Sequence, residues 1–483
     1  MTEQRVMTTS GKTIVLDAAL LQEFQANLRG ELIRPGDITY DATRQVWNGL
    51  VDKRPGLIVR CHGVVDVMAA VNLARKHELL VSVRGGGHNV AGHAVCDGGL
   101  MIDLSPMCAV RVDPEAQTAH VQGGAIWADV DRETQAFGLA VPGGVVSMTG
   151  VAGLTLGGGY GYLRNKYGLS CDCLRSVDMV TADGQFLTAS ASKNTELFWG
   201  VRGGGGNFGI VTGFEFQLFP VGPQVLFSAP AYLAQDARRG LRAWRDFIVT
   251  TPDEFTGEFN LLTGPADPRF PEPLWGKNIY LPTGLYCGGL TAGEQVTQPL
   301  RTLGEPLLDL GGPLTYLQVQ TALDWFFPKA QYLHYWKSLY FDQFSDAAID
   351  LIIDYYERRP SARSVIAIRH LGGAIQRVEA TATAFGDRSS PFLVSIDANW
   401  QAAQDTEKNM AWVRDFWAAL KPYSNGRLYF NFPGLLEEGD DLMRTSFGVN
   451  YARLVALKNQ VDPTNLFRLN QNIKPTVRQE HGL

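Results

Sequence analysis

The sequence has no excess of basic residues and no long apolar run. Its 483 residues include 43 Lys and Arg against 49 Asp and Glu, which gives a formal net charge of -6 at pH 7. A nucleic-acid-binding surface needs a basic balance, and a membrane span needs about 20 consecutive apolar residues. The first residues also lack the basic start and apolar core of a secretory signal. We therefore expect a soluble cytoplasmic protein that binds neither nucleic acid nor a membrane.

Cysteine is scarce as well. Six cysteines are too few for a disulfide scaffold in a chain of this length, and they suit a reducing compartment. Cys171 and Cys173 form a CxC pair, but no second pair completes the ligand spacing of a metal site. We expect two half-buried thiols in a strand here and no metal.

Glycine, by contrast, is abundant and clustered. The sequence has 52 glycines, and nearly all the tight clusters precede residue 210. They are Gly85–Gly87, Gly98–Gly99, Gly123–Gly124, Gly143–Gly144, Gly157–Gly161 and Gly203–Gly206. No fixed period links them, which argues against a repeat protein. Glycine costs backbone order unless the chain must take an unusual path or approach something closely, so the clusters indicate binding.

The segments between these clusters predict an α+β first half. Apolar spacing predicts a helix over 62–79, and a buried strand follows it into the first glycine cluster. Hairpins are predicted over 108–124, around Asp-Pro, and over 177–189, around Asp-Gly. A helix is predicted over 125–138 and ends at a glycine cap.

The composition changes at a Pro-Val-Gly-Pro stretch near residue 220. From there to about residue 425 glycine clusters are fewer and aromatic residues more frequent. Most aromatic side chains of 321–341 suit a core, but so many Tyr and Trp also suit a pocket for a flat or apolar ligand. Strands are predicted over 364–378 and 391–400, a helix over 404–423, and a last helix ending at Gln460.

The spread of the glycines indicates a dinucleotide ligand. Runs of glycine turn backbone N–H groups toward one anion, usually a phosphate or pyrophosphate. A Rossmann domain would place one GxGxxG after its first strand, and this sequence does not fit that template. Clusters spread over more than a hundred residues suit a long dinucleotide such as FAD. His88 directly follows Arg-Gly-Gly-Gly, so its imidazole can bond the flavin ring while its neighbours hold the pyrophosphate.

Four stretches together resemble one family. They are VRGGGHNVAGHAVCDGGLMIDLS, GLTLGGGYGYLRNKYGLSCDCL, ELFWGVRGGGGNFGIVTGFEF and VDPTNLFRLNQNI. They are similar to FAD-linked oxidases of the vanillyl-alcohol-oxidase type, especially to bacterial members of the berberine-bridge-enzyme-like branch such as hydroxynicotine oxidases. The resemblance implies an α+β fold with a two-part PCMH-type FAD-binding domain, over 1–219 and 425–483. It also implies a substrate domain over 220–424, whose antiparallel sheet, flanked by helices, covers the flavin.

The resemblance also implies the cofactor-binding residues. His88 is implied as the residue bonded to FAD, and Val211 as a contact on the adenine side. The pyrophosphate is implied to lie against Arg84, Gly85, Gly86, Gly87 and Asn89, with His93 close by. A second cradle is implied at Gly150, Gly153, Gly157, Gly158 and Gly161. Asn470 and Asn472 are implied to reach the flavin or its ribityl chain.

Two positions depart from the family pattern. Many relatives attach the flavin a second time through a cysteine, but that position is Val146 here, so one covalent bond is predicted. Phe432 stands where the family usually has a tyrosine that helps take the substrate proton. Tyr429 remains as a candidate for that role.

Three further residues are candidates for the chemistry. His370 stands where relatives place a polar or acidic side chain over the flavin; the alternative is a surface or core histidine. Asp397 lies among apolar residues, where a carboxylate is costly unless paired or functional. It is therefore a base, a substrate anchor or a salt-bridge partner. Thr149 matches a position that gates oxygen in the family, or it caps a helix.

These features predict an FAD-dependent oxidase. We expect hydride transfer to flavin N5 from a small aromatic or apolar alcohol, amine or secondary-metabolite intermediate, and reduction of molecular oxygen to hydrogen peroxide. A flavin dehydrogenase with another acceptor and a carbohydrate oxidase are alternatives, since sugars also stack on aromatic rings. A flavin-loaded binding protein and a Rossmann NAD(P) enzyme also stay open. The sequence predicts no oligomeric state.

Overall fold

The first hundred residues build a small mixed sheet. The computed structural model describes residues 3–434 and 439–476, and its first sheet has the strand order β3-β4-β6-β5. Strands β4, β6 and β5 run parallel, while β3 is antiparallel to β4. The bounds are β1 (Gln4–Met7), β2 (Thr13–Leu16), α1 (Ala18–Ala26), β3 (Glu31–Ile33), α2 (Tyr40–Arg44), β4 (Leu57–Arg60), α3 (Val64–Lys76), β5 (Val81–Arg84) and β6 (Leu100–Asp103). Helix α3 confirms the helix predicted over 62–79.

A five-stranded antiparallel sheet follows, with the order β11-β10-β12-β8-β7. Both predicted hairpins are present, as β7 with β8 and β10 with β11. The bounds are β7 (Val110–Asp113), β8 (Thr118–Gln122), α4 (Trp127–Gln135), β9 (Leu139–Ala140), α5 (Val151–Leu156), α6 (Arg164–Tyr167), β10 (Leu174–Val180), β11 (Phe186–Ser190), α7 (Thr195–Val201), β12 (Ile210–Gln217) and β13 (Phe219–Pro220). The strand predicted at the CxC pair is wrong: Cys171 and Cys173 are buried in a 3-10 turn, η1 (Ser170–Cys173), just before β10.

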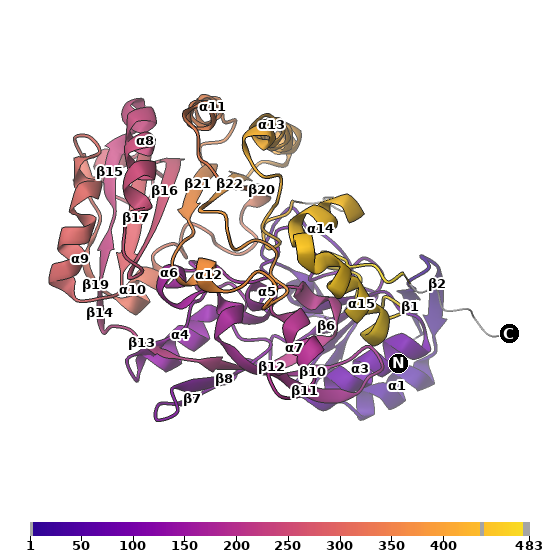
Figure 1. Cartoon of the computed structure of the whole chain (residues 1–483). Coiled ribbons are helices and arrows are strands. Elements are labelled where there is room, and N and C mark those ends of the chain that lie inside the picture. Colours follow the sequence, from indigo (N-terminus) through magenta and orange to yellow (C-terminus); the bar gives the residue numbers. More distant parts are fainter. Residues whose placement is uncertain (1–2, 435–438, 477–483) are drawn as a thin grey trace.

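The aromatic part of the chain forms a third, larger antiparallel sheet. Its main path is β18-β15-β17-β16-β21-β22-β20, with β14 and β19 joined at one side. Helices α8, α11 and α13 cover one face of this sheet (Figure 1) and share one apolar core with it. The bounds are β14 (Gln224–Ser228), β15 (Pro230–Leu233), α8 (Ala237–Ile248), β16 (Phe255–Thr263), β17 (Asn278–Tyr286), α9 (Leu290–Thr297), β18 (Leu308–Asp309), β19 (Gly312–Thr315), α10 (Tyr316–Thr321), β20 (Leu333–Phe341), α11 (Asp346–Glu357), β21 (Val365–His370), α12 (Ala374–Arg377), β22 (Phe392–Trp400) and α13 (Thr406–Leu420).

Strand alternation gives this sheet two different faces. In β22, Val394, Ile396 and Ala398 belong to the core beneath the helices. Ser395 and Asp397 therefore point to the opposite face, which looks toward the glycine-rich half of the molecule. This inner face therefore carries the polar side chains of the sheet that can act on a ligand.

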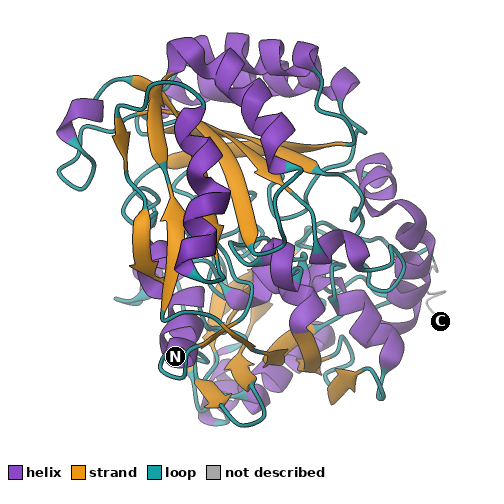
Figure 2. Ribbon diagram, turned by 60° about the vertical axis from the view of Figure 1, so that its left-hand side comes forward, coloured by secondary structure: helices purple, strands orange, loops and turns teal. Residues whose placement is uncertain are grey.

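The C-terminal segment returns to the first half of the chain. Helices α14 (Asp440–Phe447) and α15 (Tyr451–Val461) lie beside α7 and the second sheet rather than the third (Figure 1). Figure 2 shows the long strands of the third sheet and its covering helices in the upper part of the molecule and the shorter strands below. The Asn207 side chain fixes this return, since its Nδ2 donates to the Gln471 carbonyl (3.0 Å) and its Oδ1 accepts from the Ile473 N–H (2.9 Å). The α+β class with an antiparallel sheet flanked by helices is confirmed. The outer ends of the expected segments 1–219 and 425–483 lie outside the described residues.

Candidate active site and cofactor cavity

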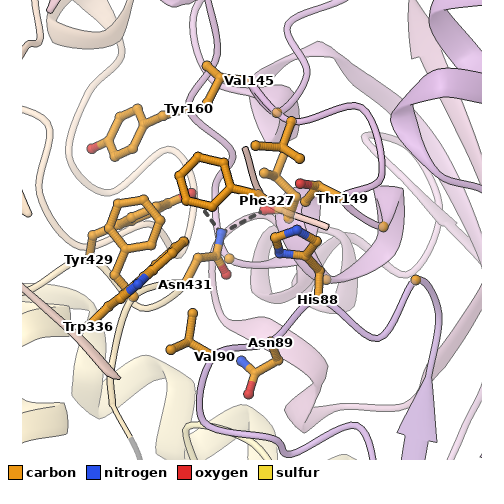
Figure 3. Close-up of a pocket in the computed structure, with 18 of the residues that line it drawn as sticks. His88, Asn89, Val90, Val145, Thr149, Tyr160, Phe327, Trp336, Tyr429 and Asn431 are labelled. Atoms are coloured by element: carbon orange, nitrogen blue, oxygen red, sulfur yellow. Dashed lines mark hydrogen bonds between the residues drawn. The ribbon is translucent and has the colours of Figure 1, made fainter. Parts of the chain in front are cut away.

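A cavity of about 690 Å³ lies between the glycine-rich loops and the inner face of the third sheet. Its lining comes from the Gly85–Gly87 loop, helix α5, the Gly203–Gly206 loop, strands β16, β17, β21 and β22, and residues near Asn470. Figure 3 shows His88 and Thr149 on one side of this space and Trp336 and Tyr429 on the other. Segments more than 380 positions apart thus meet at one site.

The His88 ring is held by an aromatic stack. Trp47 stacks on it with ring centroids 4.1 Å apart and 15° between the planes, and Trp47 also stacks on His334 at 3.9 Å and 14°. The Trp47 indole N–H donates to the Phe327 carbonyl at 2.9 Å. Burial, with a smaller contribution from His334, lowers the His88 pKa to about 3. His88 is therefore a neutral imidazole, the form in which a ring nitrogen can act as a nucleophile.

Sequence reasoning missed Trp47 and His334. Nothing local marks either residue, because their contact forms only in the fold: Trp47 lies between α2 and β4, and His334 lies on β20. His334 is fixed by a 2.7 Å hydrogen bond between its Nδ1 and Asn399 Oδ1.

Two glycine loops approach each other at the floor of the cavity. A Cβ on Gly86 would lie 2.4 Å from the Gly150 Cα, and one on Gly150 would lie 2.5 Å from the Gly86 N. Gly153 and Gly206 also line the cavity, yet a Cβ on either would meet nothing within 4 Å. The first pair lets the loops touch, whereas the second pair leaves open space that a ligand can enter.

Most of the expected cofactor residues line this cavity, but four do not. The lining includes His88, Gly85, Gly86, Gly87, Asn89, His93, Gly150, Gly153, Gly157, Val211 and Asn470. Gly158 instead packs against Phe385, and Gly161 against the Gly143 carbonyl. Asn472 and Arg84 are also outside the lining, although Asn472 Oδ1 is buried without a partner.

Arg84 was expected to face a pyrophosphate, and this placement is wrong. Its guanidinium makes a two-pronged ion pair with Asp103, with 2.8 Å from Nε to Oδ1 and 2.5 Å from Nη2 to Oδ2. The two residues are directly paired across the parallel strands β5 and β6. Arg84 therefore holds together the ends of β5 and β6, and the glycine loop begins at the end of β5.

Polar atoms without partners gather at the cavity. His88 Nε2, Asn470 Oδ1 and both polar atoms of the Gln471 amide are buried without a hydrogen bond. A buried polar group without a partner is costly, so these atoms indicate a polar ligand. Together with the open space at Gly153, they form a cradle that FAD would fill.

The inner face of the sheet supplies the acidic candidate. Asp397 is 4% exposed and lines the cavity, and burial raises the pKa of its carboxyl to about 7, while Arg369 and Ser395 oppose the rise. Its Oδ2 accepts from Ser395 Oγ (3.2 Å), and its Oδ1 has no partner. Asp397 thus combines a free acceptor with a pKa near neutrality, which suits a general base.

His370 was expected over the flavin, and this placement is wrong. Its ring centroid lies 5.9 Å from Phe392, and its Nδ1 lies 3.4 Å from Asn165 Nδ2, away from the cavity lining. The cause is the parity of β21: the neighbouring residue, Arg369, takes the cavity side.

Tyr429, Phe432 and Thr149 all line the cavity. The Tyr429 hydroxyl accepts from Asn431 Nδ2 (2.7 Å) and from the Gly159 N–H (3.2 Å), and burial raises its pKa to about 12. A phenol with this pKa stays protonated and is suited to donate a hydrogen bond rather than to take a proton. Thr149 lies just ahead of α5, and Val146 lines the same stretch.

The aromatic segment divides between pocket and core. Four aromatic residues line the cavity, namely Trp325, Phe326, Phe327 and Trp336, whereas Tyr335 and Phe341 lie in the core under the helices.

No cluster of three or more His, Cys, Asp or Glu able to hold a metal occurs within residues 3–434 and 439–476. Nor does any helix in those ranges have the length and apolarity to span a membrane.

Comparison with known proteins agrees with this geometry. The chain matches the FAD binding domain family over residues 55–190 and the berberine and berberine-like family over residues 428–474. It is 31% identical to (R)-6-hydroxynicotine oxidase of Paenarthrobacter nicotinovorans, over 93% of this chain and 97% of that protein. The chain belongs to the berberine-bridge-enzyme-like FAD-linked oxidoreductases. As a member of that family it is an FAD-binding enzyme.

Two further matches define the family relationship. The crystal structure of 6-hydroxy-D-nicotine oxidase from Arthrobacter nicotinovorans superposes with a TM-score of 0.80 at 30% identity, over 92% of this chain and 98% of that one. A carbohydrate oxidase of Microdochium nivale is 26% identical, over 91% of this chain and 92% of that protein. The berberine-bridge-enzyme-like architecture thus accounts for nearly the whole chain.

Proposed function

We propose that this FAD-linked oxidoreductase is an oxidase with its flavin bonded to His88 alone. The observation that carries the proposal is the neutral His88 imidazole, clamped by Trp47 at the wall of the glycine-lined cavity. An imidazole nitrogen of His88 would bond the methyl group of the flavin ring in place of one of its hydrogens. The two protons and two electrons released by that exchange would reduce one molecule of oxygen to hydrogen peroxide.

Bound FAD supplies the acceptor for a hydride from the substrate. The side chains of the protein serve the proton transfer, the hydrogen bonding and the access of oxygen. Asp397, with its unpartnered Oδ1 and a pKa of about 7, takes the substrate proton. Tyr429 donates a hydrogen bond from a phenol that stays protonated. Thr149 borders the same cavity, where oxygen would reach the cofactor, and the aromatic side chains of the lining, among them Phe326 and Trp336, would exclude water.

The names of the relatives support an oxidase. One is named a hydroxynicotine oxidase and another a carbohydrate oxidase. The substrate we propose is a small aromatic or apolar molecule, because Trp325, Phe326 and Phe327 line the cavity. A carbohydrate is the second candidate, favoured by the same rings and by the name of the Microdochium relative. A dehydrogenase with another electron acceptor would show itself by slow reoxidation in air.

The domain division and the cellular location are proposals as well. We propose that residues 1–219 and 425–483 form the FAD-binding domain and that 220–424 form the substrate domain, which fits the division between the sheets. A cytoplasmic location is also still a prediction.

Acid denaturation tests the covalent bond. Yellow colour should stay with the acid precipitate of the wild-type protein and pass into the supernatant for His88→Ala. His93→Ala is the matched control, because this second half-buried histidine of the same cavity lining should leave the colour with the precipitate. Free colour from the wild type would rule out the bond, and bound colour in His88→Ala would show a second attachment point.

A further inference from the structure

Four charged side chains form one connected network on the inner face of the third sheet. Arg164 Nη1 lies 3.0 Å from Glu258 Oε1, and Arg369 Nε lies 3.4 Å from the same oxygen. Arg369 Nη1 donates to Ser395 Oγ at 2.8 Å, and Ser395 Oγ donates to Asp397 at 3.2 Å. A single chain of contacts thus joins two guanidinium groups, one glutamate and the candidate base.

This network is almost completely removed from solvent. Arg164 is 0% exposed, Glu258 6%, Arg369 8% and Asp397 4%. Glu258, Arg369 and Asp397 line the cavity, while Arg164 lies behind them. Charges in such a place act strongly on a bound molecule, because little water screens them.

The network offers one vacant acceptor beside one cation. Asp397 Oδ1 has no partner, and Arg369 uses Nε and Nη1 for Glu258 and Ser395. A guanidinium has five N–H donors, so Arg369 has donors left for a ligand. A hydroxyl group can donate to Asp397 and accept from Arg369 at once. A protonated amine can donate, but it has no lone pair for Arg369 and is repelled by it.

The net charge of the network also disfavours a protonated amine. Arg164 and Arg369 outnumber Glu258, and Asp397 is protonated below pH 7 because burial raises its pKa to about 7. The charged groups packed around Asp397 are Arg369 on β21, Glu258 on β16 and, behind them, Arg164 on α6. The site is therefore positive when Asp397 is neutral and balanced when it is ionised, and in neither state does it carry a net negative charge.

We infer that the enzyme oxidises a hydroxyl group and rejects protonated amines, and that Arg369 is the residue that makes this choice. The inference rests on the proposed function and adds the substrate class to it. The alcohol gives its O–H proton to Asp397 and its C–H hydrogen, as hydride, to the bound flavin, and becomes a carbonyl. Both hydrogens and both electrons then pass to oxygen, which becomes hydrogen peroxide.

Ligands that share one ring test the inference on the FAD-loaded enzyme. Benzoate, benzyl alcohol and benzylamine differ in charge and in lone pairs, and each reports binding through the flavin absorption spectrum. At pH 6.5 the wild type should bind benzoate at least tenfold more tightly than benzylamine. Benzoate binding should weaken above pH 7, where ionised Asp397 repels the carboxylate. A panel of matched arylalkyl alcohols and amines should show flavin reduction by alcohols at least tenfold faster.

Two arginine variants identify the residue responsible. Arg369→Gln should weaken benzoate binding about tenfold and bring the alcohol and amine rates to within about threefold of each other, whereas Arg369→Lys should keep much of the preference. Arg269→Gln is the matched control, because it removes the same charge from the cavity lining, but its guanidinium pairs with Asp267 on an exposed loop. This variant should keep the wild-type preference.

The outcomes separate this inference from the proposed function. Equal or faster reduction by amines in the wild type, an unchanged preference in Arg369→Gln, or no spectral response to any ligand would overturn the inference. The first and the last result would leave an FAD oxidase with another substrate class, and an unchanged preference would leave an alcohol oxidase whose selectivity does not come from Arg369. Absence of peroxide when reduced enzyme meets air would instead overturn the proposed oxidase.

Discussion

Trp47 takes no direct part in the proposed chemistry, but it positions His88, which does. Its indole is fixed by the Phe327 carbonyl and holds the His88 ring on one face, with His334 on the other side of the stack. The clamp covers one face of the imidazole, whose Nε2 is buried, and burial is the main cause of the low His88 pKa. The orientation and the neutrality of His88 thus have a common origin.

The role of the clamp can be tested by changing Trp47. An aromatic pair is worth about 0.5–1.5 kcal/mol, so Trp47→Leu should slow the formation of acid-stable flavin by roughly 2- to 10-fold, since 1.36 kcal/mol is a factor of ten. Trp47→Phe keeps a stacking ring and should stay near the wild-type rate. The measurement is the time course of acid-stable flavin after FAD is added to flavin-free protein.

Total FAD binding separates positioning from folding in that experiment. If Trp47→Leu binds FAD as the wild type does but attaches it slowly, the ring acts through His88. An unchanged rate of attachment in Trp47→Leu would contradict the proposed clamp.

Single residues could be predicted where the local sequence is unusual. His88 follows three glycines, and Asp397 interrupts an apolar strand, and both line the cavity. Trp47 and His334 were not predictable, because their contact joins positions 287 apart through the fold alone. His370 was misplaced by one residue, since strand parity sends Arg369 to the cavity instead.

At the scale of elements, the loop at Gly86 and the start of α5 are matched to each other. A side chain on Gly86 would collide with the backbone of Gly150, whereas one on Gly153 would meet no protein atom within 4 Å. The glycines of the two loops therefore have different roles: Gly86 and Gly150 allow backbone contact, whereas Gly153 leaves room for the ligand.

A pair of alanine substitutions tests this division. Gly86→Ala should force the loops apart and lower the thermal midpoint of the flavin-free protein by several degrees. Gly153→Ala should keep or raise that midpoint, because alanine favours a helix by about 1 kcal/mol over glycine, yet it should reduce the FAD content. Thermal unfolding and the visible spectrum of the purified variants measure both effects, and equal midpoints in the two variants would contradict this account.

Elements with strong local periodicity were predicted well. Helix α3, the hairpin of β7 and β8, and helix α13 all fall within their predicted ranges. The strand predicted at Cys171 failed, because the η1 turn there is set by contacts with Gly158 and Gly159, which no local pattern shows. Arg84 was read as a phosphate contact for a similar reason: its partner, Asp103, is a neighbour only in the folded sheet.

At the scale of the whole molecule, histidines with lowered pKa values contribute to the acid sensitivity of the flavin-free protein. Burial lowers the pKa values of His88, His93, His334 and His370 to about 3 or 4. The unfolded chain binds a proton at each near pH 6.5, so their contribution to stability is present above that pH and is lost as the pH falls toward 4. Asp131 and Asp397, with pKa values raised to about 7, act in the opposite direction but are fewer.

We therefore expect the free energy of unfolding to fall between pH 6.5 and 4. His370→Asn removes one of the four groups without touching the cavity lining. This variant should lose about 1.4 kcal/mol less per pH unit across that range, the value for one proton. Urea unfolding at pH 6.5, 5.5 and 4.5 measures the slope, and an identical slope in both proteins would show that His370 does not titrate as described.

The return of the C-terminal segment has a consequence for biosynthesis. Asn470 and Gln471 line the cavity, and Asn207 bonds the backbone of Gln471 and Ile473. A nascent chain emerges N-terminus first, so the RGGGH loop leaves the ribosome nearly 400 residues before the cradle can be completed. The cavity is therefore complete only after the segment around Gln471 has been synthesised, so tight capture of the flavin follows the synthesis of that segment.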